Sequence, residues 1–205
     1  MIAKVGFSLQ LIVTGIGASL ALALVLTPLC MVSKSIKDMV RTLISVLDPL
    51  PGIALLPLSI LWFGIGNAAI IFVMIHSVLW PMLLNVITGF DSVPMIYQEV
   101  GKSFGLNRLR QVWLIYAPAA FPSILTGVKT GWARAWRALI SAEMVFGATG
   151  KGGGLGWDIY TKRSFLDMPG LFASLIVIMV IGILIEEMLF STIERRTLYK
   201  WGMIR

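Results

Sequence analysis

The stretch "LQLIVTGIGASLALALVLTPLCMV", residues 9–32, contains no charged side chain. A continuous apolar run of about 18 or more residues is long enough to cross the hydrocarbon core of a bilayer as a helix. These residues therefore predict a membrane-spanning helix near the start of the chain.

Four further stretches have the same character. Residues 72–89 and 171–185 contain no charged side chain, whereas two other apolar stretches include charged or helix-breaking residues. Residues 38–63 are interrupted by Asp48-Pro49-Leu50-Pro51-Gly52, and residues 119–146 contain Lys129, Arg134, Arg137 and Glu143. The sequence thus predicts an all-α, polytopic membrane helical bundle with about five transmembrane helices.

Composition supports the membrane class and excludes others. Of the 205 residues, 58% are hydrophobic and 13% are charged, against roughly 25% charged in soluble domains. No stretch outside the spans is long enough for a separate soluble core, so residues 1–205 are expected to form a single transmembrane domain without a catalytic one. The net charge of +7 is better explained by membrane topology than by nucleic acid, because the basic residues lie beside the spans.

The basic residues indicate an orientation, since they accumulate on the cytoplasmic side of membrane proteins. Five spans with a cytoplasmic C-terminus would place the N-terminus outside. Either the first helix inserts in that direction or an N-terminal helix is absent from this sequence, and we favour the second. One predicted face carries ten basic residues and the other carries four: Lys34, Lys37, Arg41, Lys102, Arg108, Arg110, Arg195, Arg196, Lys200 and Arg205 against Lys4, Lys151, Lys162 and Arg163.

The longest polar interruption is "QEVGKSFGLNRLRQVWLIYAP", residues 98–118. We expect a short helix over residues 94–104, because Gly105 can end it with a positive φ. A second helix is expected over residues 106–116, with Pro118 opening the next span.

This segment resembles the "EAA" loop of ABC importer permeases, in which a glutamate and two small residues precede a glycine, and an isoleucine-x-leucine-proline follows. Here Val100 and Gly101 stand at the small positions and Ala117 replaces the leucine, with the spacing intact. The resemblance implies an ABC importer type I permease-like core. Its cytoplasmic coupling helix, in a loop at about residues 91–117, would dock on an ATPase subunit through Glu99, Val100, Gly101, Gly105 and Leu106. An interfacial loop without a partner is the alternative, which Trp113 and Tyr116 favour.

Other stretches resemble the nitrate, taurine and aliphatic-sulfonate branch of these permeases: residues 50–73, 122–147, "GGGLGWDI" and "ERRTLYKWG". The resemblance implies a multi-pass protein of the bacterial inner membrane, in contact with lipid, that forms a homodimer and works with an extracytoplasmic solute-binding protein. It also implies transport of a small anion, no catalytic residues and no cofactor, because ATP is bound by the ATPase subunit. The resemblance also implies that an N-terminal segment, which usually precedes this core, is absent from the sequence given.

The break at residues 48–52 is a candidate part of the translocation path. Pro49 and Pro51 remove amide donors, and unpaired backbone in a membrane is tolerated where it faces protein or a watery cavity. With the resemblance, Asp48, Pro49 and Pro51 are expected to line the path; an ordinary proline kink is the alternative.

Arg134 and Arg137 lie three residues apart on one helical face in the middle of a predicted span. An arginine there costs at least roughly 2.5 kcal/mol on insertion scales, so both should face the bundle interior or water. They could form, with Glu143 nearby, a cationic part of the path for an anion such as a sulfonate or nitrate. We favour the alternative that each pairs with an internal acid, such as Glu143 or Asp48, or with backbone carbonyls.

Three further features point away from catalysis. His76, the single histidine, has no neighbouring ligands for a metal motif, so we expect a hydrogen-bonded structural side chain. The segment "GATGKGGGLG", residues 147–156, has the wrong spacing for a phosphate loop, and we expect an extracytoplasmic turn that meets the binding protein or gates the path. A membrane-embedded enzyme acting on a lipid or isoprenoid would need converging acids, whereas Asp48, Glu143 and Glu186 are scattered.

Overall fold

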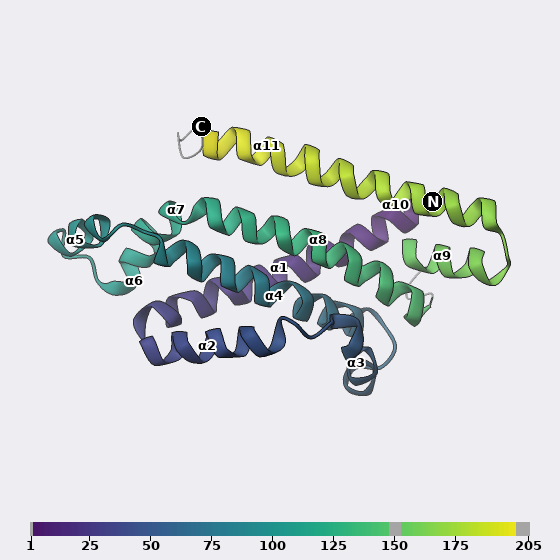
Figure 1. Cartoon of the computed structure of the whole chain (residues 1–205), viewed down its shortest axis with the longest axis horizontal. Helices are drawn as coiled ribbons and strands as arrows, with labels where there is room; N and C mark the ends of the chain where they lie inside the picture. Colours follow the sequence, from purple (N-terminus) through teal and green to yellow (C-terminus); the bar gives the residue numbers. More distant parts are fainter. Residues whose placement is uncertain (1, 148–152, 200–205) are drawn as a thin grey trace.

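The computed structural model describes residues 2–147 and 153–199, which form an elongated bundle of helices (Figure 1). Short 3₁₀ or π-helical turns extend several helices, at Gly52–Leu55, Val112–Tyr116, Ile185–Phe190 and Arg195–Tyr199. The α-helices are α1 (Ile2–Val32), α2 (Lys34–Leu47), α3 (Leu56–Phe63), α4 (Asn67–Asp91), α5 (Met95–Ser103), α6 (Arg108–Gln111), α7 (Ala117–Ala119), α8 (Phe121–Phe146), α9 (Leu155–Ser164), α10 (Met168–Leu184) and α11 (Ser191–Glu194).

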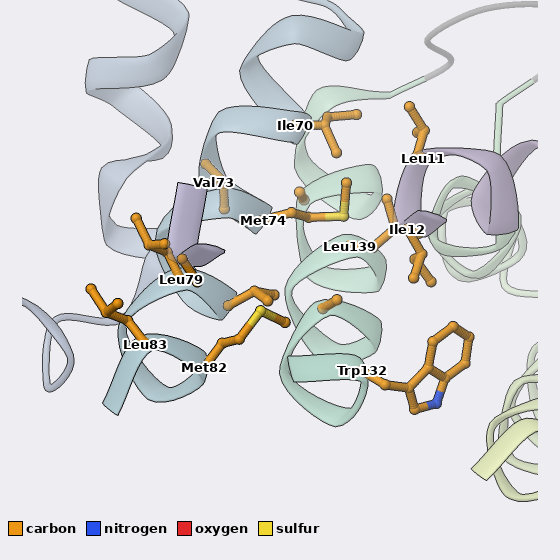
Figure 2. Packing of buried hydrophobic residues seen from close by; sticks show 14 of the residues in the cluster. Leu11, Ile12, Ile70, Val73, Met74, Leu79, Met82, Leu83, Trp132 and Leu139 are labelled. Carbon is orange, nitrogen blue, oxygen red and sulfur yellow. The ribbon is translucent and has the colours of Figure 1, made fainter. Parts of the chain in front are cut away.

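Helix α4 is the centre of the bundle, with α1 and α8 packed against it. Figure 2 shows Met74 of α4 beside Leu139 of α8 and Ile12 of α1, and all three are fully buried. Glycines bring the backbones close: a Cβ on Gly15 would lie 3.1 Å from Met74, and one on Gly131 would lie 2.9 Å from Val78. Small residues at contact points are typical of helix packing in membranes.

The number of candidate membrane spans agrees with the predicted polytopic membrane helical bundle. Three helices are long and apolar enough to cross a membrane: α1, α4 and the continuous helix Met168–Leu198. Two further pairs qualify only as bent spans, with an 88° bend between Lys34–Leu47 and Gly52–Phe63 and a 71° bend at Ala120, between Leu109–Ala119 and Phe121–Phe146. The total is five if each bent pair is one span. The first bend, at residues 48–51, lies within the predicted break at residues 48–52.

The second bend corrects two expectations. The predicted helix over residues 106–116 is instead a short α6, which a π-helical turn and α7 continue to Ala119. Pro118 lies inside α7, and the long helix begins after the bend, at Phe121. The two prolines four residues apart, Pro118 and Pro122, are the sequence signal for this bend, and the predicted helix boundaries did not take the second of them into account.

The two ends of the bundle differ in the elements that they carry. The α1–α2 junction, α5, α6 and the C-terminal end of the described chain lie toward one end, and α9 lies toward the other (Figure 1). Of the segments that were predicted to share a basic face, those within the described residues lie at this one end (Figure 1).

Helix α2 is fastened to its neighbours near both of its ends. Lys37 near its start and Arg41 in its middle form ion pairs with Asp91, the last residue of α4; the Arg41–Asp91 distance is 2.8 Å. After its last residue, the carboxylate of Asp48 forms an ion pair with Arg134 of α8 at 2.6 Å. The helix therefore connects the end of α4 with the middle of α8.

Candidate functional site

A cavity of about 370 Å³ lies at the break between α2 and α3, against the middle of α4 and α8. Because α2 ends at Leu47 and α3 begins at Leu56, the break supplies backbone and short side chains to one wall, and α8 supplies its two central arginines to another. The residues that line it are Asp48, Leu50, Pro51, Gly52, Ile53, Ser77, Arg134, Arg137, Ala138 and Ser141.

Gly52 holds the break close to α4. A Cβ at this position would collide with the Ser77 hydroxyl and would lie 3.0 Å from the backbone oxygen of Val73. The Ser77 hydroxyl itself donates to that oxygen at 2.9 Å. The absence of a side chain on Gly52 therefore lets the interrupted segment pack directly on the α4 backbone.

The arginines and the acid of the break meet in this cavity. Arg134 donates to the Asp48 carboxylate at 2.6 Å, and the two side chains keep 35% and 27% of their surface exposed. Arg137 is exposed and donates through Nε to the backbone oxygen of Ala133 at 3.0 Å. The expectation that each arginine pairs with an internal acid or a backbone carbonyl is confirmed, with Asp48 as the acid.

Glu143 lies elsewhere and does not line this cavity. Its carboxylate is fully buried, and accepts hydrogen bonds from the Ser8 hydroxyl of α1 and the backbone N–H of Gly156, both at 2.7 Å. The Ser8 oxygen in turn accepts from the N–H of Leu155 at 3.0 Å. Glu143 therefore joins α8 and α1 to the first turn of α9, which is a different location from the one expected beside the arginines.

A second acid, Asp158 of α9 itself, fastens this helix to α1 and α10. The Asp158 carboxylate accepts hydrogen bonds from Lys4 of α1 at 2.5 Å and from Ser174 of α10 at 2.6 Å, and Lys162 lies 3.9 Å away. Burial alone would raise the pKa of Asp158, but the bonds from Lys4 and Ser174 and the charges of Lys4 and Lys162 outweigh it and hold the pKa below the ordinary 3.8. Sequence patterns gave no sign of this cluster, because its members are far apart in the chain.

Replacing Asp158 with asparagine should lower the free energy of unfolding by about 1.5–3 kcal/mol at pH 7, the usual contribution of hydrogen bonds to a charged group. A carboxylate whose pKa is lower in the folded state stabilises the protein above its unfolded pKa, ~3.9. The difference in the free energy of unfolding between wild type and variant should therefore shrink as the pH falls below ~3.9. Thermal unfolding of both purified proteins at pH 7 and at a pH below ~3.9 measures this difference. An equal difference at the two pH values would contradict the stabilising role of the Asp158 carboxylate.

Two aromatic contacts of the core involve tryptophans. Trp132 is buried and stacks on Trp136, with ring centroids 5.7 Å apart. The prediction that His76 is hydrogen-bonded is wrong: neither ring nitrogen has a partner among the described residues, and the ring lies edge-on to Trp80. No cluster of three or more metal-ligating side chains occurs within residues 2–147 and 153–199.

At the end of the bundle that carries α5, Gly105 ends this helix as the sequence predicts. Its φ is +67°, its N–H donates to the oxygen of Lys102 at 2.9 Å, and the N–H of Leu106 donates to the oxygen of Gly101 at 3.0 Å. These are the two bonds of a Schellman motif. A Cβ on Gly101 would lie 2.5 Å from the end of Ile115, so this glycine lets α5 pack on the turn that follows α6.

The rest of α5 points apolar side chains away from the bundle. Met95 is 70% exposed and Phe104, directly after the helix, is 80% exposed, with Ile96, Tyr97 and Val100 between them also exposed. Glu99 is exposed on the same short helix. The described chain thus presents a compact, partly apolar and partly charged projection at one end.

Of the glycine-rich segment at residues 147–156, positions 148–152 lie outside the described residues.

The sequence matches the family described as "Binding-protein-dependent transport system inner membrane component" over residues 14–199. The chain belongs to this family. Its members are transport components of the inner membrane, in agreement with the apolar helices described above. The alternative of a membrane-embedded enzyme finds no support in the family.

Three relatives of this inner membrane component family illustrate the similarity. A putative ABC transporter permease protein of Methanocaldococcus jannaschii is 31% identical over 88% of this chain and 66% of its own length. The taurine transport system permease protein of Escherichia coli is 29% identical over 75% and 54%. The nitrate import permease protein of Synechocystis is 28% identical over 88% and 64%. The matched region of this chain thus spans between about half and two thirds of these relatives.

Proposed function

We propose that this chain is the permease subunit of an ABC importer and that it moves a small anion across the membrane. The observation that carries the proposal is the pair of arginines in a cavity at the break of a membrane helix, within a family of transport components. An arginine in a membrane span faces protein or water and marks a candidate ion path. The solute would be of the kind that the relatives' names give, such as nitrate, or taurine with its negatively charged sulfonate group.

In this proposal α5 is the coupling helix. Its exposed apolar residues and Glu99 would enter a groove on an ATPase subunit, which binds and hydrolyses the ATP. Two features support this role: the glycine-capped end of the helix, and its position on the end of the bundle where the basic segments lie. Val100, Gly101, Gly105 and Leu106 would hold the helix in its docking orientation.

The remaining partners follow from the same proposal. An extracytoplasmic solute-binding protein would deliver the anion to the end of the bundle that carries α9. Two copies of the chain would pair to enclose the path. The helix Met168–Leu198 supports this pairing, because only 6% of its most apolar 18-residue window is buried within the chain. Asp48, Pro51, Arg134 and Arg137 would line the path, with Pro49 in the adjoining turn; Glu143 would instead secure α9.

Replacing Glu99 with lysine should reduce ATP-driven uptake at least tenfold, because it reverses the charge on the face that would meet the ATPase. The test is to reconstitute the chain with its ATPase and binding protein in liposomes and to measure uptake of nitrate and taurine. Ser103→Lys, at the exposed end of the same helix, is the matched control for added charge. Absence of a copurifying ATPase from wild-type membranes, or full uptake with Glu99→Lys, would contradict the role of α5.

A further inference from the structure

We infer that the cavity at the α2–α3 break selects its anion by charge, and that Asp48 is the residue that sets the selection. The inference rests on the proposed function, because it concerns the anion that this cavity would admit. Asp48 limits the cavity to one net positive charge, and the cavity therefore takes singly charged oxyanions in preference to doubly charged ones.

The charge of the cavity follows from its lining. Of the described residues that line it, three are charged: Asp48, Arg134 and Arg137, and the others are apolar or neutral. Two guanidinium groups and one carboxylate give the cavity a net charge of +1, which is the sum used below. Glu143 does not enter this sum, because its carboxylate is turned toward Ser8 and the start of α9.

Asp48 is held in position rather than free to withdraw. Its N–H donates to the oxygen of Ile44 at 2.9 Å, so it caps the last turn of α2, and its carboxylate is 2.6 Å from Arg134. The guanidinium of Arg134 is therefore already partly neutralised. Among the described residues, the Arg137 guanidinium donates one hydrogen bond, to a backbone oxygen. Arg137 therefore remains as the cation of the cavity that has no acidic partner in this part of the chain.

An anion in this cavity thus meets one uncompensated positive charge. A monoanion brings the net charge of the cavity to zero. A dianion brings it to −1, because its second negative charge finds no further cation and is repelled by the Asp48 carboxylate. The fork geometry of Arg137 suits the flat or tetrahedral face of an oxyanion.

The test compares methanesulfonate and sulfate, which are similar in shape and size but carry one and two negative charges. Equilibrium binding of each labelled anion is measured on the permease purified with its ATPase and without the binding protein. Wild type should bind methanesulfonate more tightly. Asp48→Asn raises the sum to +2 and should shift the ratio of the two affinities toward sulfate by about tenfold or more.

Matched variants separate charge from structural damage. Asp48→Asn combined with Arg134→Gln returns the sum to +1 and should restore the preference for methanesulfonate. Arg137→Gln alone gives zero and should lose binding of both anions. If Asp48→Asn does not assemble, Ser141→Lys raises the sum to +2 while leaving the Asp48–Arg134 pair intact, and it should shift the ratio in the same direction.

The outcomes are distinguishable from failure of the proposed function. An unchanged ratio in Asp48→Asn or Ser141→Lys, or a double variant that keeps the shifted ratio, would overturn the inference. So would a wild type that binds neither anion here but still supports ATP-driven anion uptake as a complete importer. If the complete wild-type importer takes up no anion, the proposed function itself fails.

Discussion

Replacing Gly105 with proline is expected to abolish ATP-driven uptake while the chain remains in the membrane. The φ of Gly105 is +67°, whereas proline fixes φ near −65°. Proline also removes the N–H that donates to Lys102 and displaces the neighbouring bond from Leu106 to Gly101. Helix α5 would therefore lose its defined end and its orientation on the bundle.

Two control variants test this explanation. Gly105→Asn should retain most of the uptake, because asparagine tolerates a positive φ and keeps the N–H. Gly64→Pro creates the same backbone conflict at the end of α3, because φ there is +72° and the N–H donates to the oxygen of Ile60 at 2.8 Å. It should damage stability and still allow association with the ATPase. Normal uptake with Gly105→Pro would remove the basis for the coupling role of α5.

Replacing Gly156 with valine is expected to prevent stable folding of the end that carries α9. A Cβ there would collide with the backbone oxygen of Ile140 and lie 2.8 Å from the Cβ of Glu143, and neither position on α8 can move easily. If α9 shifts away, Glu143 loses the N–H of Gly156 and stays buried. Leaving a buried polar group without its hydrogen-bond partner typically costs about 1–3 kcal/mol, and the displacement of α9 adds to this cost.

The measurement is thermal unfolding of the detergent-purified chain, followed by size-exclusion chromatography. Gly17→Val is the matched control, because a Cβ at that position of α1 meets nothing within 4 Å. It should unfold within a few degrees of wild type. A Gly156→Val protein with the stability of the Gly17→Val protein would show that α9 does not need this close contact.

Local features of the sequence predicted the parts of the fold that depend on local chemistry. Pro49 and Pro51 indicate a break because each lacks an amide donor, and the structure bends there. Gly105 indicates a helix end because it adopts a positive φ without strain, and α5 ends there. Residue type and position alone were sufficient for both.

Contacts between distant segments could not be predicted in the same way. Asp48 and Glu143 were equal candidates as partners of Arg134, and the choice depends on how α2 and α8 pack. Ser8 and Glu143 lie 135 positions apart in the sequence and meet only because α1 and α8 are neighbours in the bundle. Pairing of this kind follows from tertiary packing, which no local pattern specifies.

Helix α2 is attached by ion pairs near both ends, and this has a mechanical consequence. Its 14 residues make a rod of about 21 Å at 1.5 Å per residue. One end is tied to Asp91, four residues before α5 begins, and the other carries Asp48 into the cavity. If α5 is the coupling helix, as proposed, a displacement of α5 that moves Asp91 should be transmitted along this rod to the Asp48–Arg134 pair in the middle of the bundle.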